Sequence, residues 1–286
     1  MDSIEDMIRV NQEQARFYDA IQTAEADTGH GGYAKNKKAN LFTRAWAGLR
    51  YRQQAAVKEA GIEQRVKEAH LRWAKLKAGG DCLEIGCFAG SRFTFDLVAL
   101  AGSYLGVDLS PKAVQALNQK LAGRGLAYKA SAEAVDLLVM DTRRKFDLLY
   151  AYGVLHHFKD PVPLFDKLAS LMRPDSLLVF TEPSAIHPLY RAIRNLYRPF
   201  QSDADWEWPF TPKTVAALEA RFQVVEGFGW GSWSLPLSVL TGLPLLGHLA
   251  RPAYRARVRI EVEQGWHPGV WNNSFVTAAY RLSPSN

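Results

Sequence analysis

The segment most informative about the architecture reads Leu83-Glu84-Ile85-Gly86-Cys87-Phe88-Ala89-Gly90. Its apolar half predicts a buried strand over 81–86. Its glycines predict a tight turn, because glycine adopts backbone angles that are unfavourable for other residues. A helix is expected over 91–100. A strand, a glycine turn and a helix begin a βαβ unit, and the free N–H groups at the start of the helix favour an anionic group.

The glycine spacing narrows the choice of ligand. A dinucleotide fingerprint needs glycine at the positions of Gly86, Phe88 and Ser91, and two of these three are not glycine. A diphosphate is therefore disfavoured. Asp108 ends the next predicted strand, 22 residues after Gly86, and a carboxylate there can accept both hydroxyls of a ribose. Ser110 already supplies the helix cap. The pattern indicates a nucleoside without a diphosphate.

Strands and helices alternate through the rest of this region. Strands separated by helices predict a parallel sheet that is covered on both faces, with all strand carboxyl ends at one edge. We therefore expect an α/β fold with a Rossmann-like, doubly wound, mostly parallel seven-stranded sheet whose last strand is antiparallel. Its strands are expected at 81–86, 104–108, 126–129, 146–152, 176–182, 222–228 and 275–282, with intervening helices at 91–100, 111–121, 132–140 and 163–172.

Additional segments flank and interrupt this domain, which spans 79–286. Residues 1–78 are predicted to form an N-terminal helical cap, with breaks at 27–32 and at Gly61. Two insertions, 183–215 and 230–272, are expected on the substrate side. The second is rich in Leu, Pro, Trp and Arg, and three interpretations stay open. It is a lid on the domain's own surface, an apolar wall for the acceptor, or a peripheral membrane contact assisted by Arg251, Arg255, Arg257 and Arg259.

Bulk properties exclude several classes of protein. The net charge is +6, but no basic stripe with interleaved aromatic residues is present, so a nucleic-acid partner is not expected. The only cysteines, Cys82 and Cys87, have neither disulfide nor zinc-ligand spacing, and the acidic start lacks the apolar core of a signal peptide. A cytoplasmic location follows as the default. No metal is expected, because the adjacent His156 and His157 side chains diverge and no carboxylate lies at ligand spacing.

The motif at 84–90, together with Asp108, resembles the class I S-adenosylmethionine-dependent methyltransferase family, in its broad small-molecule branch. The resemblance covers roughly 80–182, and Phe88 replaces the middle glycine of the family pattern. It implies S-adenosyl-L-methionine as the methyl donor and S-adenosyl-L-homocysteine as the product. It further implies that Glu84 orders the loop and contacts the methionine amino group region. Asp108 would bind the ribose, and Leu109 would pack on the adenine.

Two later motifs extend this resemblance. Ser131-Ala132-Glu133 stands where the family usually carries acidic-Ala-Glu, so Ser131 replaces the acid near the adenine amino group and the backbone of Ala132 would serve the adenine. The strand at 146–152 continues into Leu155-His156-His157, as in the branch, which implies that Tyr152 lies near the reactive methyl group. Tyr18 either closes over the cofactor or packs in the core. The predicted cofactor residues are Tyr18, Glu84, Gly86, Cys87, Phe88, Gly90, Asp108, Leu109, Ser131, Ala132, Glu133 and Tyr152.

Three residues are candidates for catalysis. Methyl transfer is an in-line displacement that depends on positioning, and a hydroxyl acceptor also benefits from a base. His157 is the first candidate base, because histidine titrates near neutral pH; substrate positioning and a structural role stay open for it. His156 orients the loop or contacts the cofactor. Glu182 either faces the acceptor or is a capping or salt-bridged acid.

The sequence thus predicts a biosynthetic enzyme that methylates a small or medium acceptor, lipophilic or aromatic, most readily on oxygen. Carbon methylation of a prenyl-like or aromatic substrate is an alternative, with Glu182 or His157 removing a proton. A catalytically inactive, cofactor-binding scaffold is an alternative of another class, left open by Phe88 and Ser131. Both a monomer and a homodimer are compatible with the sequence.

Overall fold

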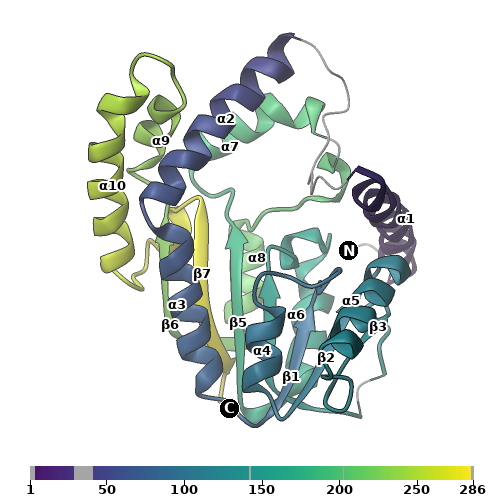
Figure 1. The fold of residues 1–286 in the computed structure, drawn as a ribbon. Coiled ribbons are helices and arrows are strands. Elements are labelled where there is room, and N and C mark those ends of the chain that lie inside the picture. The colour runs from purple at the N-terminus through teal and green to yellow at the C-terminus, as the bar shows by residue number, and fades with distance from the viewer. Residues whose placement is uncertain (1–3, 29–40, 142, 202, 285–286) are drawn as a thin grey trace.

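The computed structural model describes residues 4–28, 41–141, 143–201 and 203–284 (Figure 1). These residues form one seven-stranded sheet in the order β3-β2-β1-β4-β5-β7-β6. Strands β1 to β5 are parallel, while β7 is antiparallel to both of its neighbours. The predicted fold class is confirmed. The strands are β1 (Asp81–Ile85), β2 (Ser103–Asp108), β3 (Ala130–Ala134), β4 (Phe146–Tyr152), β5 (Met172–Pro183), β6 (Phe222–Trp230) and β7 (Phe275–Leu282).

Helices cover both faces of the sheet, and each face has its own apolar core. One core contains Trp73, Leu97, Leu117 and Tyr150, and the other contains Phe165, Leu218, Phe180 and Trp271. On the first face lie α3 (Ile62–Lys75), α4 (Thr94–Leu100) and α5 (Pro111–Gly123), and on the second lie α6 (Pro161–Leu171) and α8 (Pro212–Glu219). Both faces are therefore buried, as a parallel sheet requires.

The predicted N-terminal helical region divides into three differently placed helices. Helix α1 (Ile4–Thr28) packs beside α5, whereas α2 (Leu41–Glu59) packs against α9 (Leu235–Thr241) and α10 (Gly247–Glu263). The predicted break between α2 and α3 is confirmed at Gly61, whose φ is 71°. Helix α3 covers the sheet itself. Its buried His70 contacts the Tyr150 hydroxyl at 2.8 Å and the Thr181 hydroxyl at 2.9 Å.

The predicted third strand is wrong by four residues. Residues 126–129 form a turn in which the Lys129 N–H donates to the Leu126 carbonyl at 3.1 Å, and Tyr128 is 82% exposed. The strand is Ala130–Ala134, and its last residue pairs with Asp108. The predicted helix at 132–140 is also wrong, since the chain turns there on the Asp136 side chain. Small alanines obscured the two-residue alternation that marks a strand.

The carboxyl ends of the parallel strands point toward the end of the molecule formed by α2 and α7 (Pro188–Tyr197), at the top of Figure 1. Ligands bind at this edge of open α/β sheets, at the point where the strand order reverses. The reversal lies between β1 and β4, because β2 and β3 extend the sheet to one side and β5 to the other. A functional site is expected there.

Candidate functional site

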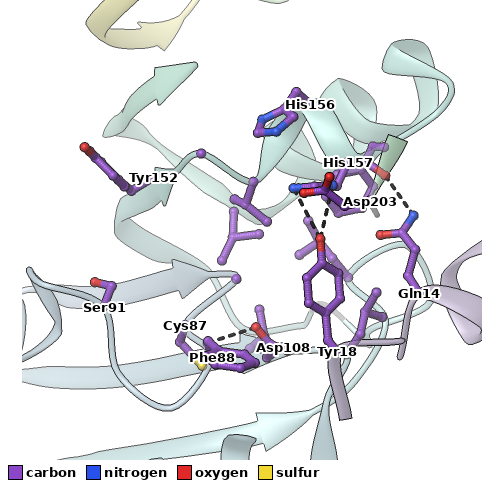
Figure 2. A pocket seen from close by; sticks show the side chains of 18 of the residues that line it. Gln14, Tyr18, Cys87, Phe88, Ser91, Asp108, Tyr152, His156, His157 and Asp203 are labelled. Carbon is purple, nitrogen blue, oxygen red and sulfur yellow. Dashed lines mark hydrogen bonds between the residues drawn. The ribbon is translucent and has the colours of Figure 1, made fainter. Parts of the chain in front are cut away.

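A cavity of about 600 Å³ lies at this edge, at the carboxyl ends of β1, β2 and β4. Figure 2 shows side chains from several separate segments pointing into it. Helix α1 contributes residues to the lining, and so do Gln201, Asp203 and Glu207. Of the predicted site residues, those that line the cavity are Tyr18, Gly86, Cys87, Phe88, Gly90, Asp108, Leu109, Tyr152, His156 and His157. Those absent from the lining are Glu84, Ser131, Ala132, Glu133 and Glu182.

The loop after β1 has a backbone that only glycine adopts without strain. Gly86 has a φ of 68°, and a Cβ placed there would lie 2.5 Å from the Val154 Cγ2. Phe88 has a φ of 46° and is the only described residue other than glycine with a positive φ. It therefore keeps the left-handed backbone that glycine takes readily, at a cost of about 1–2 kcal/mol. Backbone strain of this kind persists where surrounding contacts hold the residue in place, and it is frequent at functional sites.

Those contacts come from Asp108 at the end of β2. Its Oδ2 accepts the Phe88 N–H and its Oδ1 accepts the Ser110 N–H, both at 2.9 Å. Burial raises the pKa of this carboxyl, and backbone N–H groups partly oppose the shift. A carboxylate has about four acceptor positions, so two backbone bonds leave capacity for a ligand. Asp108 thus orders two loops and faces the cavity.

Glu84 lies beneath the loop and not in the cavity. It is 1% exposed, and its Oε2 accepts the Tyr104 hydroxyl at 2.6 Å and the Thr94 hydroxyl at 2.8 Å. Burial raises the pKa of this carboxyl. Thr94 is the first residue of α4, so Glu84 fixes the start of that helix relative to β1 and β2. From this position Glu84 holds the loop and does not contact the cavity.

The motif Ser131-Ala132-Glu133 lies inside β3 because of the shifted strand, and the cavity wall beyond β2 comes instead from Val135 and Leu137. The Ala132 backbone is already engaged. Its N–H donates to the Asn118 Oδ1 at 2.8 Å, and its carbonyl accepts the Asn118 amide at 2.9 Å. Both Ala132 backbone groups therefore already have a partner on Asn118, and the adenine contact of Ala132 stays a prediction.

Glu182 is fully buried at the end of β5 and holds the loop after β4. Its Oε1 accepts the N–H groups of Val154 at 3.0 Å and Leu155 at 2.8 Å. Its Oε2 accepts the His156 Nδ1–H at 2.7 Å. Because a carboxylate only accepts, Nδ1 carries the proton, and Nε2 of the cavity-lining His156 is left as an acceptor. Glu182 acts on the cavity through this histidine.

His157 is held differently from its neighbour. Its Nδ1 donates to the Trp206 carbonyl at 2.6 Å, and the Tyr18 hydroxyl lies 3.4 Å from its Nε2, as Figure 2 shows. Burial lowers the pKa of His157 to about 3, and the adjacent His156 contributes. A histidine with this pKa stays neutral at pH 7 and is a weak base. Its contacts join α1 to the segment that contains Trp206.

Charged side chains that the sequence did not indicate also line the cavity: Arg50, Arg92, Asp203 and Glu207. Burial alone would raise the pKa of the Glu207 carboxyl. The ion pair with Arg194, together with His156 and Gln201, lowers this pKa by more than burial raises it. Burial and the neighbouring Glu207 raise the pKa of Asp203. The Asp203 Oδ1 is buried and has no hydrogen-bond partner among the described residues. A buried oxygen of this kind accepts a hydrogen bond from a ligand or from an ordered water.

Arg92 lies directly after the glycine loop. This position was the only feature of the sequence that indicated Arg92 as a site residue. Its guanidinium carbon lies 5.8 Å from the Tyr152 ring centroid, and one guanidinium nitrogen lies 3.4 Å from the Glu63 carboxylate. Asp203 and Glu207 lie within the predicted insertion 183–215, but nothing local distinguishes them from surface acids. Long-range folding brings them to the cavity.

The insertion 230–272 lies beside α2 and β6, through α9 and α10. None of its residues lines the cavity, and neither do Trp206 and Trp208. The aromatic side chains of these segments therefore do not form the cavity wall. Among the residues that the structure describes, no cluster of His, Cys, Asp or Glu suits a metal ion. No helix in the same part of the chain is long and apolar enough to cross a membrane.

Comparisons with known proteins agree with this geometry. Residues 83–178 match a family model described as a methyltransferase domain. No curated protein matches the sequence. Among solved structures, the [4+2]-cyclase SpnF covers 95% of this chain and 96% of its own, at 13% identity and a TM-score of 0.57.

Two further solved structures share the fold. The YcgJ protein from Bacillus subtilis covers 78% of this chain and 100% of its own, at 12% identity and a TM-score of 0.53. A putative sarcosine dimethylglycine methyltransferase from Galdieria sulphuraria covers 77% and 84%, at 14% identity and a TM-score of 0.51. At these identities the likeness concerns the fold alone.

Proposed function

Because residues 83–178 match a methyltransferase domain and the sheet has the order β3-β2-β1-β4-β5-β7-β6, we propose that the chain is a class I S-adenosylmethionine-dependent methyltransferase. It would methylate a small organic acceptor bound in the described cavity. S-adenosylmethionine supplies an electrophilic methyl group on a sulfonium. The observation that carries the proposal is Asp108, a cavity-facing carboxylate that also holds the strained loop at Phe88. The same carboxylate would therefore bind the ribose and hold the glycine turn in place.

The cavity suits a nucleoside that carries an amino acid. Its volume of about 600 Å³ is within the usual range for small-molecule sites, about 300–1,000 Å³. Asp108 would accept the ribose hydroxyls, and Leu109, Val135 and Leu137 would surround the base. Arg92, beside Tyr152, would pair with the carboxylate of the methionine moiety. This assignment adds Arg92 to the predicted cofactor residues.

We assign the base for a hydroxyl acceptor to His156, held by Glu182. The buried carboxylate fixes the proton on Nδ1 and leaves Nε2 to receive a proton from the acceptor. Glu182 is then a positioning residue and not a second base. His157 would hold Tyr18 and the 201–207 segment in place, because its low pKa makes it a weak base.

The acceptor end of the cavity is polar. Asp203 presents a buried oxygen without a partner among the described residues, and Gln14, Arg50 and Glu207 also line this space. We therefore expect an acceptor whose reactive end carries a hydroxyl or another hydrogen-bond donor. A lipophilic remainder, and oxygen in preference to carbon as the methylated atom, stay predictions from the sequence.

The test is transfer of a labelled methyl group from S-adenosylmethionine to panels of hydroxylated, aromatic and prenyl acceptors, after donor binding has been measured by calorimetry. Label in an acceptor, with S-adenosylhomocysteine released in equal amount, supports the proposal. Donor binding without transfer to any acceptor favours the cofactor-binding scaffold. Absence of donor binding defeats both functions.

A further inference from the structure

Three segments of this chain are strongly basic and contain no acid at all. They are 41–58, 184–201 and 231–260, which together carry eleven Arg or Lys residues and no Asp or Glu. The chain as a whole has 35 basic and 29 acidic residues, so outside these segments acids outnumber bases, 29 to 24. The three segments are far apart in sequence and contain α7, α9, most of α10, and α2 except for its last residue, Glu59.

The fold brings these segments to one end of the molecule, at the top of Figure 1. Direct contacts hold them together. Trp46 of α2 stacks on Tyr197 of α7 with ring centroids 4.7 Å apart, and the Arg52 Nε of α2 donates to the Gly242 carbonyl after α9 at 2.5 Å. The acid-free segments therefore form one continuous region, which we call the basic end.

The basic end also exposes large apolar side chains. At the turn between α9 and α10, Leu245 is 82% exposed and Leu249 is 69% exposed. Leu41 at the start of α2 is 84% exposed, and Leu196 near the end of α7 is 61% exposed. Single exposed leucines are common, but several on adjoining elements mark an interaction surface. The exposed large apolar residues of the three segments are Leu41, Phe42, Tyr51, Leu189, Leu196, Trp233, Leu240, Leu245, Leu246, Leu249 and Ile260.

The same elements also carry exposed arginines. Arg44 lies in the first turn of α2, Arg191 and Arg198 lie within and just after α7, and Arg255 and Arg259 lie on α10, all of them exposed. Leucines that enter the interface, with arginines at the level of the headgroup phosphates, characterise proteins that lie on an anionic bilayer. We propose that the basic end docks on the surface of an anionic phospholipid membrane.

The position of the cavity fits this orientation. Arg50, which lines the cavity, belongs to α2, and the cavity-lining Gln201 and Asp203 follow α7 directly. Docking through α2 and α7 therefore sets the acceptor side of the cavity next to the bilayer. The docking itself depends on leucines and arginines outside the cavity lining, so its test does not depend on methyl transfer.

The experiment is flotation of the full chain with vesicles of phosphatidylcholine alone and of phosphatidylcholine mixed with phosphatidylglycerol. We expect binding to the mixed vesicles, little binding to the neutral ones, and release at high salt. The double variant Leu245→Ser/Leu249→Ser should lower the bound fraction at least tenfold. Leu76→Ser is the matched control, because Leu76 is 64% exposed beyond the end of α3, away from this surface. It should bind as the unmodified chain does.

Reversing the charge of two arginines separates the electrostatic attraction to lipid headgroups from the contribution of the exposed leucines. Arg255→Glu/Arg259→Glu should abolish binding to the mixed vesicles. The control Arg143→Glu, at an arginine whose side chain is 92% exposed, should leave binding nearly intact. No binding of the unmodified chain to mixed vesicles, or equal binding to neutral ones, overturns the proposal. So does self-association in solution that the leucine variant abolishes without any vesicle binding, because the leucines then serve a protein contact.

Discussion

Replacing Glu182 by Gln perturbs one buried carboxylate that organises the histidine loop. Glu182 accepts the Val154 and Leu155 N–H groups with one oxygen and the His156 Nδ1–H with the other. The amide keeps a single oxygen. If that oxygen stays on Val154 and Leu155, the NH2 group faces the His156 Nδ1, which must then give up its proton. His156 would carry its proton on Nε2 and no longer accept one from the cavity side.

The expected cost follows from the bonds that change. Loss of a charge-assisted hydrogen bond costs about 1.5–3 kcal/mol, and a buried N–H left unpaired costs about 1–3 kcal/mol. The His156 N–H, 3.3 Å from the Glu182 Oε2, is the group left unpaired. Part of the loss is recovered, because the amide can donate to the new His156 tautomer. We therefore expect Glu182→Gln to lower the free energy of unfolding by about 2–4 kcal/mol.

Urea unfolding at pH 7 measures this loss, and nitrogen NMR of the histidine rings measures the tautomer. The control is Glu133→Gln, at an exposed glutamate of β3 that does not line the cavity, and it should change neither quantity. A Glu182→Gln protein with unchanged stability and with the His156 proton still on Nδ1 would refute the assignment of Glu182 as the residue that orients this histidine.

Three further outcomes follow from the structure. Burial lowers the pKa of His70 to about 3, compared with the ordinary histidine pKa of 6.5. As the pH falls below 6.5, the unfolded chain therefore binds a proton at this histidine while the folded chain does not. Stability should therefore fall toward acid, by about 2 kcal/mol at pH 5 from this residue, and urea unfolding of His70→Gln should show a shallower decline. Gly86→Ala should lower the free energy of unfolding by about 1–3 kcal/mol in thermal melts, because φ is positive at this position and the new Cβ meets the Val154 side chain. Adding Val154→Ala should restore part of this loss. Full stability of the single variant would contradict this. With a hydroxyl acceptor, His156→Ala should lower kcat by about 10²–10⁴-fold and leave donor affinity unchanged, and normal turnover would exclude His156 as the base.

The sequence predicted the sheet and its ligand edge well, because these depend on local patterns. The strand before Gly86 and the strand that ends at Asp108 have clear apolar runs and clear ends, and parallel strands bring their ends together. The prediction of the third strand was wrong because it also depended on a local pattern, which was weak in this segment. Its alternating positions are small alanines, which give no contrast between a strand and a helix.

The roles of the acids could not be read from local sequence. Glu84 and Glu182 stand at strand ends, as a cavity residue would, but the pleat turns both beneath the loops they hold. Arg50 and Asp203 reach the cavity from segments outside the central domain motifs. Their placement depends on how α2 and α7 pack at the strand ends, which no nearby residue pattern encodes.

Calorimetric titration of S-adenosylmethionine into the unmodified chain and into Asp108→Asn tests the central claim most directly. Replacing one carboxylate oxygen removes a charged hydrogen bond worth about 1.5–3 kcal/mol, which corresponds to a roughly 10–150-fold weaker Kd. The control Asp175→Asn, at an exposed aspartate in the amino-terminal half of β5, should bind as the unmodified chain does. We predict saturable binding by the unmodified chain and the control, with the loss confined to Asp108→Asn. No binding by the unmodified chain, or equal affinity in Asp108→Asn, would contradict the account.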